Sequence, residues 1–536
     1  MMLQNKFNLS KILLILILII ALFLRVYKLD QIPPAISWDE AAVGYNAYTI
    51  ANWGRDEWGN FLPLVFKSFE DYKHPVHIYI TAIFVKILGL NEFSTRLPAA
   101  IFGTLNVLLI YLLGKRFFKS ELLGIITAFM LAFSPYALQF SRFNHELQFV
   151  LFFFMLGLYL FFKGLEKKNF YLTLSFLSFG ICLITYHSAK IIVPLIFTLL
   201  IILYFKELIK IKFYFYLGLF ILLLFVGIIA FNPALLGAAR IKQTGFGEKD
   251  FKQTQIYQTT KNENLARLEI IYNQYLLHFQ PKYLFESGDQ NGRHSSQVVG
   301  EFYKIDLIFL VIGFLALLYK RSKTSLIILT WALLALIPSA VAKEAPHAAR
   351  AGFMLGSFNL IAAYGLYYLI NFVKVNYIKV GILIFVLGVN LVLFNTYFTY
   401  YLTKYSVDKY SDWQYGMKQI VGYVGEHPEY FQVYMTDQRS QPYIFFLYYL
   451  KTPLPEFLES VQYNDADSRS YNLVSFFDRY YFGVGDPIEY IPTKYIMQIL
   501  EPSKYSGLRY KDAFEVLSFI KYPDGNEGYY IVTAKE

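Results

Sequence analysis

The chain has 536 residues, of which 56% are hydrophobic and only 16% are charged, and its mean hydropathy is +0.39. Soluble globular domains carry about 25% charged residues, so this composition argues against a soluble enzyme, and the high apolar fraction excludes a disordered chain. A single cysteine, Cys182, excludes a disulfide framework. The net charge of +10 is compatible with nucleic acid, acidic lipid or a membrane topology signal as its cause.

Apolar stretches close to the length of a bilayer crossing, about 20 residues, recur along the chain. We predict eleven spans, at residues 9–27, 94–113, 121–140, 147–162, 170–187, 189–205, 213–231, 305–319, 324–342, 352–373 and 380–400. We expect the first span to be a retained anchor rather than a signal peptide, because no A-x-A cleavage site precedes Pro33. The predicted fold class is therefore mainly α, a polytopic membrane helix bundle of about eleven spans.

The linkers between the spans alternate in charge. Five of them are basic and together hold fourteen basic and three acidic residues, which accounts for the whole net charge and leaves no support for nucleic-acid binding. Basic linkers face the cytoplasm, so we predict a plasma-membrane protein with a cytoplasmic N-terminus and with segments 28–93, 232–304 and 401–536 outside. The apolar stretch 76–90 is expected to lie along the membrane interface, because a crossing there would move every later basic linker to the outer face.

The chain changes character near residue 401, where the apolar runs shorten and charges become frequent. Three segments have the patterns of a small α/β domain: a strand FQVYMT (431–436), a helix QPYIFFLYYLK (441–451) and a closing strand YYIVT (529–533). We therefore predict two domains. Residues 1–400 form the transmembrane domain, in which the outer loops 28–93 and 232–304 make the active-site face, and residues 401–536 form an extracytoplasmic α/β domain.

Ionisable residues beside a membrane are candidates for chemistry. Asp39 and Glu40 follow the first span within ISWDEAAVGYNAYTIANWG (36–54). A carboxylate at this place can act as a general base on an acceptor hydroxyl or can hold a cation. The alternative interpretation is a pair of solvated loop charges.

A second group of ionisable residues lies just before the interfacial stretch, where Lys73, His74 and His77 surround Pro75. Two histidines three residues apart can ligate a metal, but no third ligand is evident nearby in the sequence. A contact to a phosphate or hydroxyl group and a plain turn are equal alternatives for His74.

A third group is composite and comes from two outer segments. Arg293 and His294 lie ahead of the eighth predicted span, and Lys343, His347 and Arg350 lie ahead of the tenth. The planar fork of arginine suits the recognition of phosphate. The alternative is that these charges anchor the protein to lipid headgroups.

Taken in order, these motifs resemble the bacterial membrane glycosyltransferases of the GT-C class, family 39, whose relatives include the protein O-mannosyltransferases and the aminoarabinose transferase of lipid A. The resemblance covers residues 10–360 and rests on WDE (38–40) with Ala41, Gly44 and Tyr45, KHP (73–75), RLP (96–98) with Gly103 in the run 91–118, HFQPKYLFESGDQNGRH (278–294) and PHAAR (346–350). Each motif alone is weak, whereas their order and the matching topology are specific. Residues 401–536 carry no motif of the family.

The resemblance implies an enzyme that moves a hexosyl or pentosyl group from a polyprenyl phosphate to a hydroxyl acceptor at the outer face of the membrane, with inversion in one displacement. Asp39, supported by Glu40, would be the catalytic base. Cationic side chains would bind the donor and stabilise the departing phosphate, and the candidates are Lys73, His74, Arg293, His294, Lys343, His347 and Arg350. No cofactor is expected and no metal site is assigned, since a divalent metal is not indicated.

The acceptor stays open at this point: a protein, a lipid, lipopolysaccharide or a cell-wall glycan would each supply a hydroxyl group. The expected partners are this acceptor, the lipid-linked donor and the bilayer. The alternative function is a transporter or flippase of lipid-linked sugars. Transporters place charges and broken helices near the membrane midplane, whereas the ionisable clusters here lie in outer loops, which favours transfer chemistry.

Overall fold

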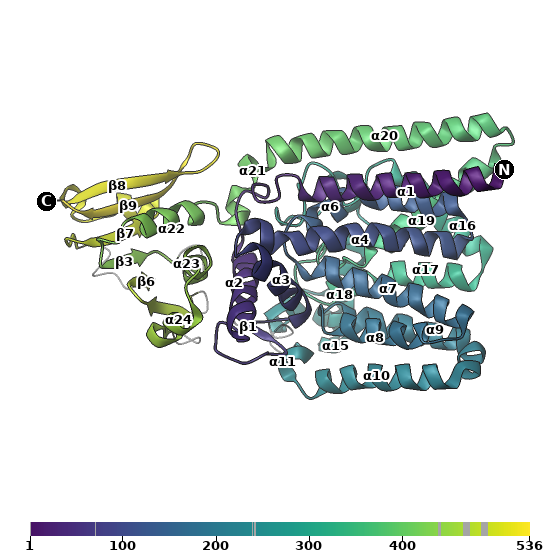
Figure 1. The fold of residues 1–536 in the computed structure, drawn as a ribbon, viewed down its shortest axis with the longest axis horizontal. Coiled ribbons are helices and arrows are strands. Elements are labelled where there is room, and N and C mark those ends of the chain that lie inside the picture. Colours follow the sequence, from purple (N-terminus) through teal and green to yellow (C-terminus); the bar gives the residue numbers. More distant parts are fainter. Residues whose placement is uncertain are drawn as a thin grey trace. The chain divides into compact units, whose positions relative to one another are not determined.

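A computed structural model of the chain describes residues 2–69, 71–237, 240, 243–437, 441–464, 472–483 and 491–535. The chain divides into two compact units (Figure 1). Unit 1 comprises Met1–Tyr27 and Ala99–Tyr400, and unit 2 comprises Lys28–Pro98 and Tyr401–Glu536. The expected domain boundary near residue 400 therefore coincides with a boundary between units. The assignment of residues 28–93 to the transmembrane domain differs from this division, because these residues pack with the C-terminal segment.

Unit 1 is a helix bundle whose long helices run side by side (Figure 1). The helices of this bundle, together with the short α6 and α18, are α1 (Met2–Val26), α4 (Glu92–Phe118), α5 (Glu121–Ala132), α6 (Pro135–Ser141), α7 (Glu146–Lys167), α8 (Tyr171–Leu183), α9 (Ala189–Leu208), α10 (Lys212–Ala230), α16 (Asp306–Lys320), α17 (Lys323–Leu334), α18 (Ile337–Ala340), α19 (Met354–Phe372) and α20 (Asn376–Thr403). The outer segment between α10 and α16 contains α11 (Pro233–Leu236), α13 (Glu248–Lys252), α14 (Gln255–Thr260) and α15 (Glu263–Leu277). Each of the eleven predicted spans overlaps at least one of these helices.

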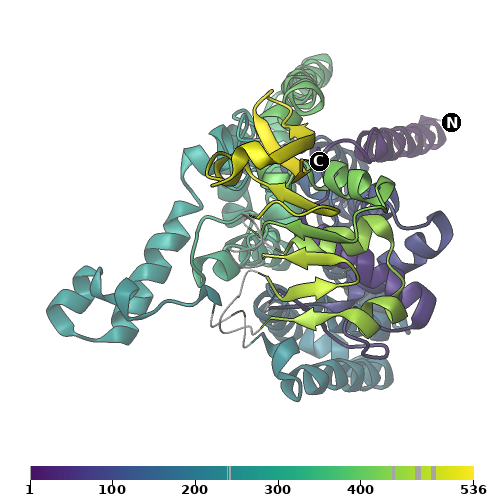
Figure 2. The same cartoon turned by 90° about the vertical axis from the view of Figure 1, so that its left-hand side faces the viewer.

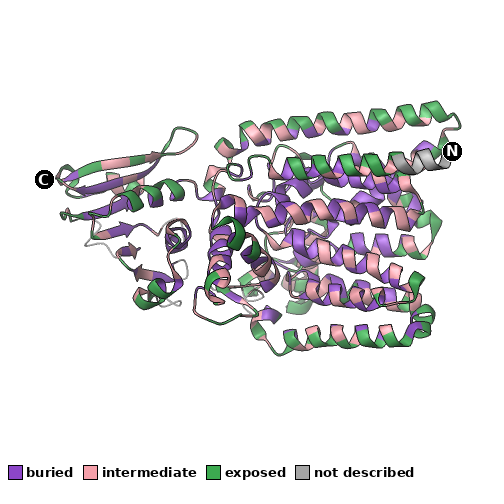
Figure 3. Ribbon diagram, viewed as in Figure 1, coloured by how far each residue is buried: buried purple, intermediate pink, exposed green. Residues whose placement is uncertain are grey.

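Six helical segments among the described residues are long and apolar enough to cross a membrane, or seven if the bent pair α5 and α6 is one span. One of the six, Ala189–Ala230, has 42 residues and covers two of the predicted spans. The predicted spans at 170–187, 305–319 and 352–373 contain helices that fall short of this test. The chain is thus a multi-pass membrane protein, while the count of eleven crossings stays a prediction. Helices α10 and α20 bury few of their residues, as expected for contact with lipid (Figure 3).

Helices α16 and α19 cross at very close range because two glycines face backbone. A Cβ added at Gly313 would lie 2.0 Å from the carbonyl oxygen of Ile361, and one added at Gly365 would lie 2.0 Å from that of Phe309. Small residues allow this kind of approach in membrane bundles, where van der Waals contact rather than hydrophobic burial favours helix association. This crossing fixes the spacing of the two helices.

Helices α5 and α6 are bent by 60° at a short break, where Ser134 caps α6 and Pro135 occupies its first turn. Two buried arginines satisfy helix ends around this break. Arg25 donates to the carbonyl oxygens of Leu131 and Ala132 at the end of α5, and Arg142 donates to those of Leu24 and Arg25 at the end of α1. Terminal carbonyl groups have no partner within their own helix, so these contacts stabilise both ends. Beyond the break, Gln139 on α6 donates to the carbonyl oxygen of Arg293 in the loop ahead of α16.

Unit 2 combines an N-terminal segment with the C-terminal domain. The N-terminal segment contains α2 (Trp38–Trp53), the hairpin β1 (Phe66–Ser68) and β2 (Asp71–Lys73), and α3 (Pro75–Leu88). The helices of the C-terminal domain are α21 (Tyr405–Asp408), α22 (Met417–Glu426), α23 (Pro442–Leu450), α24 (Leu454–Ser460) and α26 (Pro502–Ser506). Its strands are β3 (Gln432–Met435), β4 (Gln462–Tyr463), β5 (Val474–Phe477), β6 (Tyr480–Phe482), β7 (Ile496–Leu500), β8 (Phe514–Lys521) and β9 (Glu527–Ala534). The seven strands form one sheet in the order β4-β5-β6-β3-β7-β9-β8, which faces the viewer in Figure 2. Strand β3 is parallel to β6 and β7, and the other pairs are antiparallel.

The three elements predicted in the C-terminal domain are confirmed as β3, α23 and β9. Helix α2 packs on α23, because Gly44 has no side chain: a Cβ there would lie 2.5 Å from the ring of Tyr448. The hydroxyl groups of Tyr448 and Thr95 are 2.9 Å apart in the same contact. These buried contacts explain why residues 28–98 cluster with the C-terminal domain. Helix α3, within the stretch expected at the interface, has 14 residues and packs against α2.

Candidate active site

The two acidic residues at the start of α2 have different environments. Ser37 caps the helix by accepting the amide N–H of Glu40, and the Glu40 carboxylate accepts the amide N–H of Ser37 in return. This capping box orients Glu40 into the protein, where its side chain is fully buried. Asp39 is one residue earlier on the helical turn, and 42% of its side chain is exposed. The local helix geometry therefore buries one carboxylate and presents the other.

Glu40 forms a buried ion pair with Arg96. Nε of Arg96 lies 3.0 Å from Oε1 of Glu40, and Nη2 lies 3.2 Å from Oε2. The remaining donors of Arg96 bind the carbonyl oxygens of Leu29, Pro33 and Ala35. Arg96 thus ties the segment that follows α1 to the start of α2. This geometry fits a structural role for Glu40 beside Asp39, whereas a direct part in catalysis stays a prediction.

Asp39 pairs with Lys73, whose Nζ lies 2.5 Å from its Oδ1. Lys73 ends strand β2, and the hairpin with β1 places it beside the first turn of α2. His74 follows as the N-cap residue of α3, with Pro75 in the first turn, and the side chain of His74 is buried. The structure therefore brings Asp39 and Lys73 together, as two groups of opposite charge with the carboxylate accessible.

A buried acid that sequence reasoning missed lies in the loop after α2. Glu57 is buried, its amide N–H donates to Oδ1 of Asn46 at 2.9 Å, and the hydroxyl of Tyr443 lies 3.5 Å from its Oε1. Burial, with the nearby charge of Asp56, raises the pKa of Glu57 to about 8. Glu57 is not part of any motif named above, and an acidic pair such as Asp56 and Glu57 in a loop gives no sequence signal by itself.

Unit 1 contains a second cluster, formed by Asp289, His294 and His347. Oδ2 of Asp289 lies 3.1 Å from Nδ1 of His294, and the ring centroids of His294 and His347 are 4.8 Å apart. Asp289 and His294 come from the loop ahead of α16, and His347 comes from the loop ahead of α19. Sequence reasoning named both histidines and missed Asp289, although it lies five residues before His294 in a motif carried by the family resemblance.

Backbone groups and α6 hold this cluster in place. The amide N–H of Ala348 donates to Oδ2 of Asp289 at 2.7 Å, and that of Asn291 donates to Oδ1 at 2.9 Å. The ring of Phe140 on α6 stacks on His294 with centroids 5.3 Å apart. Gly288 has φ +70°, and a Cβ there would lie 2.5 Å from the hydroxyl of Ser295, so this turn requires glycine.

Electrostatic interactions set the charge state of the cluster. Burial alone would raise the pKa of Asp289, but His294, His347 and the Asn291 N–H outweigh it and hold this pKa below its ordinary range. Burial, His294 and Arg350 lower the pKa of His347 well below its ordinary value. At neutral pH, Asp289 is therefore a carboxylate and His347 a neutral imidazole.

Two further cations that the sequence did not single out are Arg240, which acts on His347, and Lys190, which lies beside His187. Arg240 lowers the pKa of both His347 and Arg350, after burial and the nearer charges. Nζ of Lys190 lies 3.1 Å from Nδ1 of His187. A field of this sign favours a bound anion.

The other predicted cations of unit 1, Arg350, Lys343 and Arg293, have different environments. Arg350 is mostly buried; it donates to the carbonyl oxygen of Lys343, and its Nη2 lies 3.5 Å from Glu344. Lys343 lies 3.1 Å from Asp250 and is about half exposed. The backbone of Arg293 is held by Gln139 and Asn291. Arg350 thus acts electrostatically on His347, whereas Lys343 forms a surface ion pair with Asp250.

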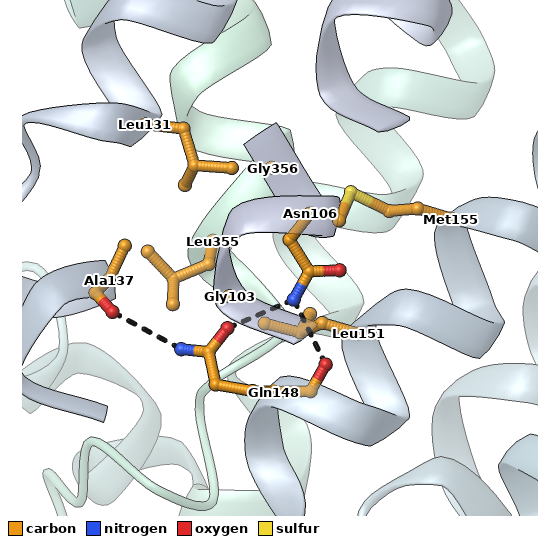
Figure 4. Close-up of a pocket in the computed structure, with 9 residues that line it drawn as sticks. All are labelled: Gly103, Asn106, Leu131, Ala137, Gln148, Leu151, Met155, Leu355 and Gly356. Atoms are coloured by element: carbon orange, nitrogen blue, oxygen red, sulfur yellow. Dashed lines mark hydrogen bonds between the residues drawn. The ribbon is translucent and has the colours of Figure 1, made fainter. Parts of the chain in front are cut away.

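The interior of the bundle also contains a small cavity without ionisable lining. Its lining consists of Gly103, Asn106, Leu131, Ala137, Gln148, Leu151, Met155, Leu355 and Gly356 (Figure 4). The amide of Asn106 donates to the side chain of Gln148 at 2.9 Å, which satisfies polar groups in an apolar place. The cavity is too narrow for a water molecule and offers no site for a sugar.

Comparisons with known proteins bear on the family and the fold. Residues 72–231 match the family described as dolichyl-phosphate-mannose-protein mannosyltransferase. An uncharacterized protein of Aquifex aeolicus is 30% identical over 161 residues, and the mannosyltransferase candidate YkcB of Bacillus subtilis is 30% identical over 171 residues. These matches cover 29% and 32% of this chain, and they span 32% and 23% of the length of those relatives.

Solved structures give the fold of the whole chain. ArnT of Cupriavidus metallidurans, in a crystal structure bound to undecaprenyl phosphate, has a TM-score of 0.57 at 13% identity, with 97% of both chains covered. The oligosaccharyltransferase of Archaeoglobus fulgidus, tethered to an acceptor peptide, has a TM-score of 0.53 at 15% identity, with 97% of this chain and 74% of that chain covered. The resemblance to GT-C enzymes of family 39 is confirmed. At these identities, the solved structures show the shared GT-C fold alone.

Proposed function

We propose that the chain is an integral membrane glycosyltransferase that moves a sugar from a polyprenyl phosphate to a hydroxyl acceptor at the outer face of the membrane, with inversion. The observation that carries the proposal is the contrast at the start of α2, where Glu40 is locked in a buried ion pair and Asp39 keeps 42% of its side chain exposed. A GT-C fold thus presents one accessible carboxylate at the place where the family resemblance expects the base.

Asp39 supplies the base for the acceptor. Its carboxylate accepts the proton of the acceptor hydroxyl as the oxygen attacks the anomeric carbon, and Nζ of Lys73 lies 2.5 Å from the carboxylate. The bond from the anomeric carbon to the phosphate oxygen breaks in the same displacement. The electron pair leaves on the phosphate, which has a low proton affinity, so no general acid is required.

The cationic groups of unit 1 stabilise the departing lipid phosphate. Arg350 and Arg240 provide positive charge around His347. Negative charge on the phosphate grows as the glycosidic bond breaks, so fixed cations lower the energy of the transition state more than that of the bound donor. ArnT, the solved relative, binds undecaprenyl phosphate, which supports a lipid phosphate as the donor here.

The test is a transfer assay with purified full-length protein. A panel of radiolabelled polyprenyl-phosphate sugars is incubated with the protein and with membrane, glycan and protein fractions as acceptors, and the product is identified by mass spectrometry. We expect label to move covalently to one fraction in wild type and not in Asp39→Asn. Donor that crosses the bilayer of a vesicle with no covalent product would instead show the alternative function, a flippase.

We also propose that the N-terminus and the basic linkers are cytoplasmic and that residues 401–536 are extracytoplasmic, on the strength of the positive-inside pattern. Reporter fusions after Lys119 and after residue 536 should give opposite sides. Readings on the same side would mean that the segment around α3 crosses the membrane and would reverse the assignment of all later loops.

A further inference from the structure

Three potential metal ligands converge at the outer end of unit 1. The carboxylate of Asp289 and one ring nitrogen each of His294 and His347 all lie within 4.8 Å of one another. Asp289 and His294 are buried, and His347 is half-buried. The two histidine rings are tilted by 54° rather than stacked in parallel, with centroids 4.8 Å apart. Two loops that are more than fifty residues apart in the chain thus bring three ligating groups to one point.

The chemistry of the three groups suits a divalent transition metal. Imidazole nitrogens with one carboxylate oxygen are a common ligand set for Zn²⁺, at bond lengths near 2.0–2.2 Å, and a buried carboxylate of this kind is usually held by further hydrogen bonds. Asp289 has such support from the amide N–H groups of Ala348 and Asn291.

The alternative is a hydrogen-bonded pair of Asp289 and His294 with His347 as a neighbour that has no part in it. This alternative gives no role to the ring of His347, although its centroid lies 4.8 Å from that of His294 and one of its nitrogens lies within 4.8 Å of the Asp289 carboxylate. A metal bound by all three groups uses both rings and the carboxylate at once. It also needs an anion nearby, because a divalent ion beside two arginines is otherwise unfavourable.

We propose that Asp289, His294 and His347 bind Zn²⁺ and leave its fourth position open to an oxygen of a phosphate. Three protein ligands with an open position are typical of zinc sites that bind a substrate, whereas structural zinc sites are closed by four. The cations around His347 then hold the other oxygens of the same phosphate. The binding of Zn²⁺ stands on the three ligands alone, whereas the identity of the phosphate as that of the lipid donor rests on the proposed function.

The first experiment measures metal content. Full-length protein is purified in detergent with a tag that contains no histidine, treated with a chelator, and titrated with Zn²⁺ while bound metal is measured by mass spectrometry. We expect one equivalent in wild type and a loss of at least about tenfold in affinity for Asp289→Asn and His347→Ala, since a lost ligand or its supporting partner costs about 10–100-fold. His427→Ala, which removes a histidine from α22's end in unit 2, is the matched control and should bind as wild type does. Wild-type protein that takes up no Zn²⁺ overturns the proposal.

A second variant guards against a misfolded loop. In His347→Cys, the thiolate replaces one ring nitrogen, and Co²⁺ in place of Zn²⁺ should give a thiolate charge-transfer band in the near ultraviolet that wild type lacks. This band arises only if residue 347 contacts the metal. Co²⁺ that binds without the band places the metal elsewhere and overturns the assignment of His347.

The last measurement separates the two proposals. Inorganic phosphate and undecaprenyl phosphate are each added to the Zn²⁺ titration, and we expect undecaprenyl phosphate to raise the Zn²⁺ affinity by about tenfold, within the usual range of coupling between sites. An equal effect of inorganic phosphate shows a general phosphate site, and no effect of either overturns the open position. Zn²⁺ that binds as expected in a protein that transfers no sugar in the assay above leaves the metal site standing and removes the proposed function.

Discussion

The acidic pair of unit 2 and the histidine cluster of unit 1 differ in how far their charged side chains are exposed. Asp39 keeps 42% of its side chain exposed beside Lys73, whereas the side chains of His294 and Asp289 are 9% and 6% exposed. A base must gain and lose a proton and must reach an incoming hydroxyl, so it benefits from access. Groups that ligate a metal ion benefit from burial, because a low dielectric strengthens the interaction between fixed charges.

The comparison also applies within unit 2, between neighbours in the sequence. Glu40 and Asp39 differ by one position, yet the capping box turns Glu40 inward to Arg96 and leaves Asp39 outward. The lesson is that a pair of adjacent carboxylates need not act as a pair. Glu40 stabilises the start of the helix that carries Asp39, and the two residues can be tested separately.

Asp39→Asn should give the largest effect. Loss of a general base typically costs about 10²–10⁴ in rate, so we expect turnover to fall by that factor while the affinity for the donor stays close to wild type. The measurement is kcat for sugar transfer with donor binding determined in parallel. Asp39→Glu should recover part of the rate, and Glu459→Gln, an exposed carboxylate of the same unit, is the control. Turnover near wild type in Asp39→Asn would remove this residue from catalysis.

Breaking the buried ion pair should affect stability rather than chemistry. Arg96→Met leaves Glu40 without its partner in a buried place, and such a loss typically costs about 3–5 kcal/mol in the free energy of unfolding. Lys73→Met breaks the half-exposed pair with Asp39 and should cost less than about 1 kcal/mol. Unfolding by denaturant in detergent checks both. Similar losses in the two variants would contradict the distinction between a structural and an accessible pair.

The arginines of unit 1 should show an intermediate effect. If Arg293 and Arg350 bind the donor phosphate, each change to alanine should lower kcat/KM for the lipid-linked sugar by about 10–100-fold, the worth of a hydrogen bond to a charged group. Lysine should restore only part of this, because a point charge lacks the fork that binds two oxygens. Arg509→Ala serves as a control in unit 2. Full recovery with lysine at either position would identify that residue as a membrane anchor.

Glu57 should show its effect as a change in the pH dependence of stability. Its pKa rises from 4.5 to about 8 in the folded protein, so between these values the folded state holds a proton that the unfolded state has released. The stability contributed by the protonated form is complete below the lower value and is lost as the pH rises, by at most about 1.4 kcal/mol per pH unit. Glu57→Gln should remove this slope. Thermal unfolding measured from about pH 5 to about pH 8 checks it, and a wild-type stability that rises over this interval would contradict the assignment.

Local and periodic features of the fold could be predicted from the sequence. Apolar length located the helices of unit 1, and alternation located β3 and β9, because both patterns follow from neighbours along the chain. The bend between α5 and α6 was not predicted, although Pro135 was its signal. Nor was the packing of α2 on α23, since the contact of Gly44 with Tyr448 joins positions some four hundred residues apart.

The same limit applies to the candidate site. Residue types and motif order found Asp39, Lys73, His294 and His347, but only the structure pairs Glu40 with Arg96 and Asp289 with His294. Burial decides which carboxylate is accessible, and burial depends on contacts between distant segments. Sequence reasoning therefore identified the groups that carry charge and could not assign each to a structural or a chemical task.

The glycine crossing of α16 and α19 has a consequence for the loops at its outer end. The loop with Asp289 and His294 leads into α16, and the loop with His347 leads into α19, so the two loops are carried by helices that touch backbone to backbone at Gly313 and Gly365. A methyl group added at either glycine would collide with the backbone of the other helix and would force the two helices, and the loops that lead into them, apart. The distance between the loops that hold Asp289, His294 and His347 therefore depends on two glycines in the helices that follow these loops.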